Sequence, residues 1–188
     1  NTHRSLMPQT TVRSKIVVAG DPAVGKTALV QMFHSAGQRF PKHYMMTLGV
    51  EFCVKAVAIT DADTSVEFHI FDTAGQDIYA EMVPKFWAGA EAVILVYDVT
   101  RAHTLEACAN WYGRMLEALG KQSLPGLLVA NKMDLRERLV VKRAEGQQMA
   151  SQLGLQLFET SAQDGLDIEQ PFQALAKLVH SPETEDIE

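Results

Sequence analysis

One glycine-bounded segment constrains this chain more than any other: it reads GDPAVGKT and spans residues 20–27. An apolar run, residues 16–19, precedes it, and an apolar-periodic stretch, residues 28–33, follows. This order predicts a buried strand, a loop and a helix. Small residues let consecutive backbone N–H groups turn toward one anion, so the loop can cradle a polyphosphate. A helix N-terminus that only caps itself is the alternative interpretation.

The residues of this loop predict how it would hold a nucleotide. The spacing G-x-x-x-x-G-K-T is complete. Lys26 adds a positive charge for the outer phosphates, and the Thr27 hydroxyl is placed to ligate a magnesium ion that bridges them. The backbone donors are expected from Ala23, Val24, Gly25, Lys26, Thr27 and Ala28.

Length and composition bound the remaining possibilities. At 188 residues, the chain has the length of one domain with a single buried core. Its net charge of −6 argues against a nucleic-acid partner, because such partners require a basic surface. No run reaches the roughly 20 apolar residues of a membrane helix. Cys53 and Cys108 lie in apolar segments, which favours buried free thiols over a disulfide.

The domain boundaries follow from composition. Residues 1–12 are polar and aperiodic, and we expect them to lie outside the fold as a disordered segment. A single domain is expected over residues 13–181. The acidic residues 182–188 should then form a flexible tail.

Within the domain, expected strands alternate with expected helices. The strands are predicted at residues 15–19, 50–59, 65–71, 92–97, 127–130 and 155–158. The helices are predicted at residues 26–35, 103–119, 144–153 and 167–179. This pattern predicts an α/β fold whose six-stranded, mainly parallel sheet has helices on both faces and one antiparallel edge strand. Residues 36–48 lack periodicity and should form a long functional loop.

Polar motifs follow three of these strands, where a parallel sheet binds its ligands. The first is DTAGQ, residues 72–76, in which Asp72 can hold magnesium through its water shell and Gly75 can donate its N–H to a terminal phosphate. NKMD, residues 131–134, and ETSA, residues 159–162, follow the last two strands. The Asp134 carboxylate can accept hydrogen bonds from two donors that guanine has and adenine lacks. The preferred base should therefore be guanine.

These four motifs, in this order over residues 15–180, resemble those of the Ras superfamily of small GTPases. The sequence TLGVEF, residues 47–52, looks like the Rab-type end of the first switch. GDPAVGKTAL, LLVANKMDL and the short tail without cysteine resemble the Rab-like subunit-twenty-seven family of the intraflagellar transport B complex. The resemblance implies a small-GTPase (P-loop NTPase) fold, GTP or GDP with Mg²⁺, and a place in the cytoplasm of cilia or flagella. It also implies partners: the small β-sandwich transport subunit twenty-five and other subunits of the complex.

The resemblance further assigns a role to each motif residue. Lys26 and the loop amides bind phosphates, Thr27 and Thr47 ligate magnesium, and Asp72 does so through water. Gln76 is of the type that orients the attacking water during GTP hydrolysis. The guanine base is held by Asn131, Lys132 and Asp134, with Ser161 and Ala162 facing its carbonyl.

Departures from the family pattern leave alternatives open. Pro22 replaces a small residue and stiffens the loop near the entry of an activating protein's arginine, which favours slow hydrolysis. The tail has neither a cysteine box nor a basic run, so if Glu188 is the natural end we expect no lipid anchor. A slow switch in intraflagellar transport is the preferred interpretation. A nucleotide-stabilised structural adaptor with negligible turnover and a conventional Rab of vesicle traffic are the alternatives, whereas NKMD disfavours a P-loop kinase or ATPase.

Two sets of apolar residues can either pack or meet a partner. Trp87 follows the second switch, and we expect it to pack in the core, with a partner surface as the alternative. The final helix carries Phe172, Leu175 and Leu178, and we expect burial against the sheet for at least two of them. The remaining contact would serve a protein partner.

Overall fold

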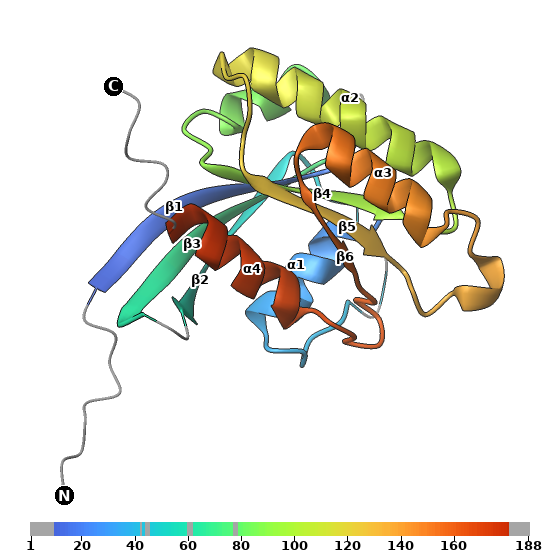
Figure 1. Ribbon diagram of the computed structural model, residues 1–188, viewed down its shortest axis with the longest axis horizontal. Helices are drawn as coiled ribbons and strands as arrows, with labels where there is room; N and C mark the ends of the chain where they lie inside the picture. The colour runs from blue at the N-terminus through green and yellow to red at the C-terminus, as the bar shows by residue number, and fades with distance from the viewer. Residues whose placement is uncertain (1–9, 42, 44–45, 60–61, 77–78, 181–188) are drawn as a thin grey trace, which may run out of the picture.

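The computed structural model describes residues 10–41, 43, 46–59, 62–76 and 79–180, in which a central sheet has helices on both faces (Figure 1). The strands are β1 (Thr10–Ala19), β2 (Val50–Ile59), β3 (Thr64–Thr73), β4 (Ala92–Asp98), β5 (Gly126–Asn131) and β6 (Gln156–Glu159). The α-helices are α1 (Lys26–His34), α2 (Ala102–Leu119), α3 (Arg143–Leu153) and α4 (Glu169–His180). Short 3₁₀ helices are η2 (Val83–Phe86) and η3 (Arg136–Arg138). The expected α/β fold is confirmed.

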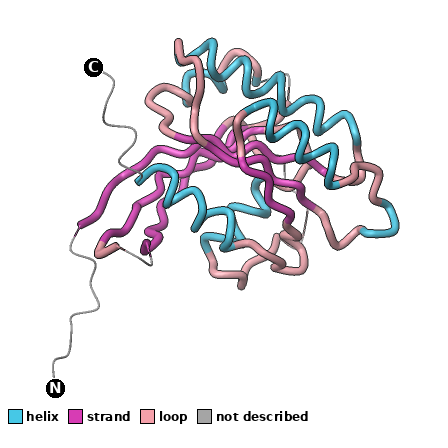
Figure 2. The backbone as a smooth tube through the Cα atoms, viewed as in Figure 1, coloured by secondary structure: helices cyan, strands magenta, loops and turns pink. Residues whose placement is uncertain are grey.

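The six strands lie in the order β2-β3-β1-β4-β5-β6. Among the strands of the described residues, β2 and β3 pair in antiparallel fashion, and the other neighbours are parallel. The parallel register places Asp98 beside Asn131, and Ala130 beside Glu159. The ends of the central strands therefore reach one edge of the sheet, where loops gather in Figure 2.

Two separate cores explain why the strands of this sheet are so apolar. Ile16 and Val18 face α1 and α4, whereas Val17 and Ala19 face α2 and α3. All four side chains are completely buried, because both faces of β1 are covered. A parallel strand buried on both faces is continuously hydrophobic, which is why residues 16–19 predicted it correctly.

The expected packing of the large apolar residues is confirmed for most of them. Phe172 and Leu175 are fully buried, and the Phe172 ring stacks on the Phe33 ring. Leu178 is partly buried against the same core. Trp87 is also fully buried and meets the Trp111 ring edge-on, so the alternative of a partner surface at Trp87 is wrong.

The first strand is longer than the sequence predicted. It begins at Thr10 rather than at residue 15, within the stretch 1–12 that we expected to lie outside the fold. Residues 10–12 pair in parallel with residues 64–66 of β3. Their side chains are exposed, so this part of the strand is held by backbone hydrogen bonds. It therefore lacks the hydrophobic pattern by which a strand is predicted from sequence. The rest of that stretch, residues 1–9, and the acidic tail lie outside the described residues.

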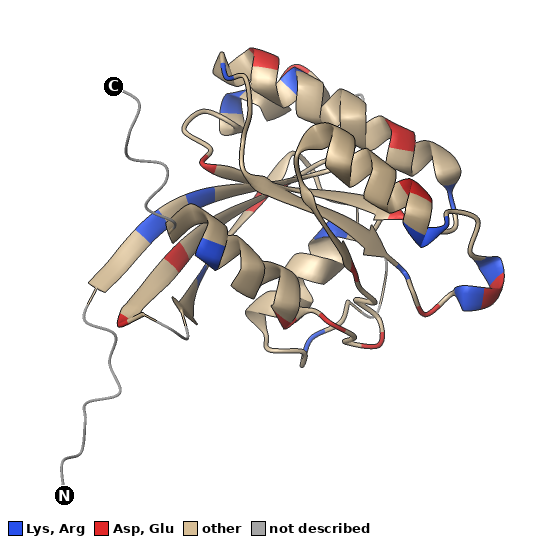
Figure 3. Ribbon diagram, in the orientation of Figure 1, with Lys and Arg blue, Asp and Glu red and all other residues tan. Residues whose placement is uncertain are grey.

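Both cysteines are free thiols, as predicted. Cys108 is fully buried in α2, and Cys53 is half-buried in β2. Acidic and basic residues are interspersed along most of the ribbon (Figure 3). Among the described residues, none of the helices combines the length and apolarity needed to cross a membrane.

Candidate functional site

The motif loops meet at one cleft of about 830 Å³ at the carboxyl edge of the sheet. Most of the residues that the sequence selected line it. They are Ala23, Gly25, Lys26, Thr27, Ala28, Thr47, Gly75, Gln76, Asn131, Lys132, Asp134 and Ala162. The structure therefore brings together five segments that are far apart in the sequence: the four motifs and the loop of Thr47.

Three selected residues lie behind this lining. Val24 is fully buried, and its carbonyl accepts a hydrogen bond from the Asn131 side chain. Ser161 is fully buried, and its hydroxyl donates to the Asp134 carboxylate over 2.7 Å. Asp72 lines a smaller neighbouring cavity of about 320 Å³, which also borders Thr27. Val24 and Ser161 therefore hold lining residues in place from behind, and Asp72 lies next to the lining residue Thr27.

The phosphate loop, the name given to the GDPAVGKT segment of residues 20–27, runs into the N-terminus of α1. Gly25 has a φ of 100°, and a Cβ at this position would lie 2.2 Å from the Asn131 side-chain nitrogen, so only glycine fits. Lys26 is buried, and its ammonium donates to the Gly20 and Asp21 carbonyls over 2.9 and 2.8 Å. Burial lowers the pKa of Lys26 to about 8, although the Asp72 and Asp21 carboxylates act in the opposite direction. A buried ammonium at a helix N-terminus suits an anionic ligand.

The DTAGQ segment lies directly against the phosphate loop. A Cβ at Gly75 would approach the Gly20 carbonyl oxygen to 2.4 Å and the Pro22 nitrogen to 2.6 Å, so no larger residue fits between the two segments. Next to it, Gln76 lines the cleft, and its side-chain amide contacts the sulfur of Met46. The second motif thus lies directly against residues 20–22 and borders the cleft there.

Three oxygen-bearing side chains converge beside Lys26. The Thr27 hydroxyl lies 2.7 Å from the Thr47 hydroxyl, and it also hydrogen-bonds to the Asp72 carboxylate. Burial raises the pKa of Asp72 to about 6, although the Thr27 hydrogen bond and Lys26 lower it. The second Asp72 oxygen is buried and has no hydrogen-bond partner among the described residues. Two hydroxyls and a carboxylate, one oxygen of which is unsatisfied, form the donor set that suits a hard cation such as Mg²⁺.

The NKMD loop is connected to the phosphate loop and to the ETSA loop. The Asn131 side chain donates to the Val24 carbonyl over 2.9 Å, and its oxygen accepts from Thr160 and from the Ala162 N–H. The ammonium of Lys132 donates to the Ala23 carbonyl over 2.8 Å. These bonds hold three loops around one space. Asp134 lines that space, where its carboxylate can accept hydrogen bonds from a base.

Residues 15–181 match the Ras family. The intraflagellar transport protein 27 homolog of Mus musculus is 45% identical over 164 residues, which cover 87% of this chain and 88% of that protein. The chain belongs to the Ras family and, within it, to the intraflagellar transport protein 27 group. Intraflagellar transport protein 27 of Chlamydomonas reinhardtii is 40% identical over 170 residues, 88% of this chain and 83% of that protein. The GTP-binding protein ypt5 of Schizosaccharomyces pombe is 36% identical over 171 residues, 89% of this chain and 78% of that protein.

A Ras-family domain implies guanine-nucleotide binding, which agrees with the base predicted from Asp134. Family membership also agrees with the P-loop fold predicted from residues 20–27. The motif resemblance noted in the sequence is therefore confirmed at the level of the family.

Sequence reasoning missed several residues of this Ras-family cleft. Phe40 is 39% exposed and lines it, where an aromatic ring can stack on a base. The signal for Phe40 was weak, because residues 36–48 have no periodicity. Asp98 and Arg101 were also missed, although Arg101 donates directly to the Pro22 carbonyl in the cleft lining and Asp98 connects to the lining through Lys132 and Arg101. Their only signal was charge beside an apolar strand, which is too common to select a site.

Proposed function

We propose that this chain is a magnesium-dependent guanine-nucleotide switch that hydrolyses GTP slowly within the intraflagellar transport complex. The observation that supports the nucleotide part is the cleft itself, which is lined both by Lys26 at the start of helix α1 and by Asp134. A guanine nucleotide needs both kinds of group, because its phosphates are anionic and its base carries two hydrogen-bond donors that a carboxylate can accept. We assign the phosphates to the loop of Lys26 and the base to Asn131, Lys132, Asp134 and Ala162.

Magnesium would be held by Thr27 and Thr47, with Asp72 acting through water. When bound, the ion would neutralise charge on the outer phosphates. Support comes from the contacts among these three side chains and from the unpartnered Asp72 oxygen. The same ion would fix the loop that ends at Thr47, because Thr47 lies in a segment without regular structure.

Slow hydrolysis is the expected enzymatic property. Gln76 lines the cleft and is of the type that positions an attacking water. Pro22 lines the same cleft and restricts the loop at the point where an external arginine would enter. The structural adaptor with negligible turnover stays the alternative, and the rate of a Gln76 variant separates the two.

The transport role rests on the relatives. Two proteins named for intraflagellar transport are 45% and 40% identical to this chain, against 36% for the GTP-binding protein ypt5. This order favours a transport subunit over a conventional Rab of vesicle traffic. We therefore propose residence in the cytoplasm of a cilium or flagellum and a constitutive complex with the small β-sandwich transport subunit twenty-five, together with other subunits.

Co-expression of the full chain with subunit twenty-five, followed by affinity purification and light scattering, tests this partner. We expect a complex with the summed mass of one copy of each protein. Phe172 and Leu175 are buried and cannot contribute to the contact, so Leu178 remains as a candidate among the three apolar residues selected on α4. Recovery of the chain only as a free monomer, or its fractionation with membranes in cells, would contradict the proposed partner.

A further inference from the structure

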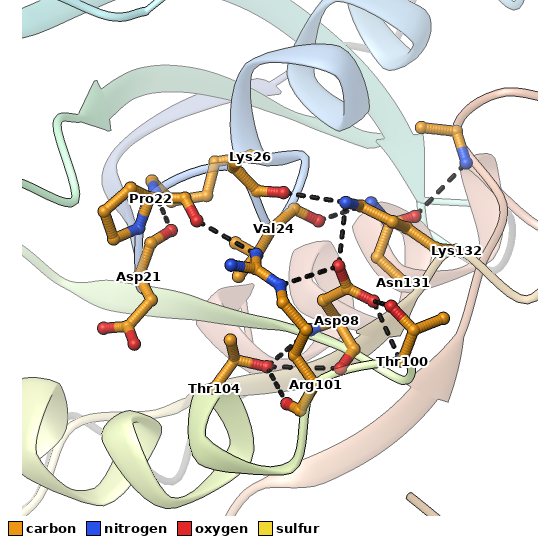
Figure 4. Close-up of polar contacts among 12 residues, drawn as sticks. Asp21, Pro22, Val24, Lys26, Asp98, Thr100, Arg101, Thr104, Asn131 and Lys132 are labelled. Carbon is orange, nitrogen blue, oxygen red and sulfur yellow. Dashed lines mark hydrogen bonds and ion pairs between the residues drawn. The ribbon is translucent and has the colours of Figure 1, made fainter. Parts of the chain in front are cut away.

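A buried carboxylate lies next to the cleft, and each of its two oxygens has two polar contacts. Asp98, the last residue of β4, is 1% exposed. Its Oδ1 accepts hydrogen bonds from the Thr100 N–H over 2.9 Å and from the Thr100 hydroxyl over 2.7 Å. Its Oδ2 meets the Lys132 ammonium at 2.8 Å and the Arg101 Nε at 3.1 Å. One oxygen of Asp98 therefore holds two cations at once (Figure 4).

Both of these cationic side chains also hydrogen-bond to the phosphate loop. Lys132 donates to the Ala23 carbonyl over 2.8 Å, and Arg101 donates to the Pro22 carbonyl through its Nη2 over 3.0 Å. The two accepting carbonyls belong to consecutive residues of the loop. Asp98 is thus connected by two short paths to one peptide segment, and one of these paths runs through the NKMD loop.

On the path that runs from Asp98 through Lys132 to Ala23, two residues have an uncommon backbone conformation. Ala23 has a φ of 60°, and Lys132 has a φ of 71°, although neither is glycine. Left-handed conformations of such residues persist only where surrounding contacts enforce them. The Lys132 ammonium supplies such contacts, because it bonds Ala23 and Asp98 simultaneously.

The charge of Asp98 is required for this arrangement. Burial alone would raise the pKa of Asp98, but hydrogen bonds from Lys132 and Thr100 lower it overall, so the carboxylate is ionised at neutral pH. An amide in its place would either direct its NH₂ group toward the two cations or lose the Thr100 bonds. Neither orientation reproduces the present contacts.

We infer that Asp98 is a positioning residue that slows the release of the guanine nucleotide, because it fixes the NKMD loop and the phosphate loop relative to each other through Lys132 and Arg101. This inference rests on the proposed function, in which the base and the phosphates occupy those two loops. A ligand that spans both loops leaves once the loops separate. Holding them in the bound arrangement removes part of the ordering cost of binding and lengthens residence.

The test measures dissociation of a fluorescent GDP analogue from the full chain in excess magnesium and unlabelled GDP. Asp98→Asn should accelerate release by roughly 10- to 100-fold, because it removes two charge-assisted contacts. Arg101→Met removes only the path to Pro22 and should accelerate release by about 3- to 10-fold. Because Arg101 acts together with Asp98, the double variant should be no faster than Asp98→Asn alone.

A matched control is Glu67→Gln on β3. The Glu67 carboxylate also meets two basic side chains, Arg13 at 3.3 Å and His69 at 2.7 Å, but it lies away from the cleft. Release from this variant should stay at the wild-type rate. If Asp98 only supported folding, its variant would lower the bound fraction and leave the rate of the remaining complex unchanged.

The outcomes separate the two claims. Wild-type protein that binds no guanine nucleotide would overturn the proposed function. If wild-type protein binds, a release rate of Asp98→Asn within about twofold of wild type would overturn the inference alone, since the expected loss is far larger. The inference would likewise be overturned if Asp98→Asn bound less of the GDP analogue but released it at the wild-type rate. It would also be overturned if the double variant released the analogue faster than Asp98→Asn by the full factor measured for Arg101→Met alone.

Discussion

The hydroxyl oxygens of Thr27 and Thr47 lie 2.7 Å apart, although twenty positions separate the two residues in the chain. Thr27 lies in the first turn of α1, and Thr47 lies near the end of the long loop that precedes β2. Thr27 also hydrogen-bonds to Asp72, whereas no bond between Thr47 and Asp72 is formed in the described residues. Thr27 is therefore the central member of the three.

This asymmetry predicts unequal effects on magnesium. Thr27→Ala should weaken magnesium binding to the nucleotide complex by roughly tenfold or more, and Thr47→Ala should weaken it less, since Thr27 contacts both other oxygens. Magnesium titrations of fluorescent GDP release give both affinities. Thr11→Ala, which alters an exposed hydroxyl near the far end of β1, is the control. Equal losses in both cleft variants would speak against this ligand arrangement.

The base assignment predicts a change of specificity. Asp134→Asn exchanges an acceptor-only carboxylate for an amide, so guanine binding should weaken and preference should move toward xanthine, whose 2-oxo group can accept from the amide. Competition binding with GDP and XDP gives the ratio of affinities. The control is Glu137→Gln, an exposed acidic residue of the neighbouring η3. An unchanged ratio in Asp134→Asn would remove Asp134 from the base site.

Turnover depends on Gln76 in the switch interpretation. Intrinsic GTP hydrolysis should be slow, because an arginine finger contributes roughly 10³- to 10⁵-fold and Pro22 obstructs one. Gln76→Leu should slow hydrolysis further, by roughly tenfold or more. Single-turnover assays compare it with Gln147→Leu, a change on the exposed face of α3. If wild type and Gln76→Leu hydrolyse GTP at the same rate, Gln76 does not have this role.

Motifs that follow apolar strands could be placed from the sequence because parallel strands end at a common edge. Lys26, Asn131 and Asp134 were found in this way, and all three line one cleft. Asp98 and Arg101 could not be found, because their contacts join residues up to 79 positions apart and follow no periodic pattern. The start of β1 at Thr10 could not be predicted either, because its first residues pair through the backbone and show no buried apolar pattern.

The half-buried thiol of Cys53 predicts a pH dependence. Burial, followed by the Asp72 and Glu51 carboxylates, raises the pKa of Cys53 to about 11. Because only the thiolate reacts, alkylation of Cys53 by iodoacetamide should be slow at neutral pH and rise about tenfold per pH unit up to pH ~10. Mass spectrometry of Cys53→Ser gives the background from Cys108, which is buried and should react only after unfolding. A plateau near pH 8.5 would show an ordinary thiol.

The identity of the nucleotide that the protein retains tests the guanine site most directly. The full chain is purified in magnesium without added nucleotide and then denatured, and the released small molecules are separated by ion-exchange chromatography against standards. The contacts of Lys26, Thr27 and Asp134 predict GDP or GTP, in an amount approaching one per chain. Release of an adenine nucleotide would contradict the assignment of the base. So would protein that carries no nucleotide and fails to bind added GDP.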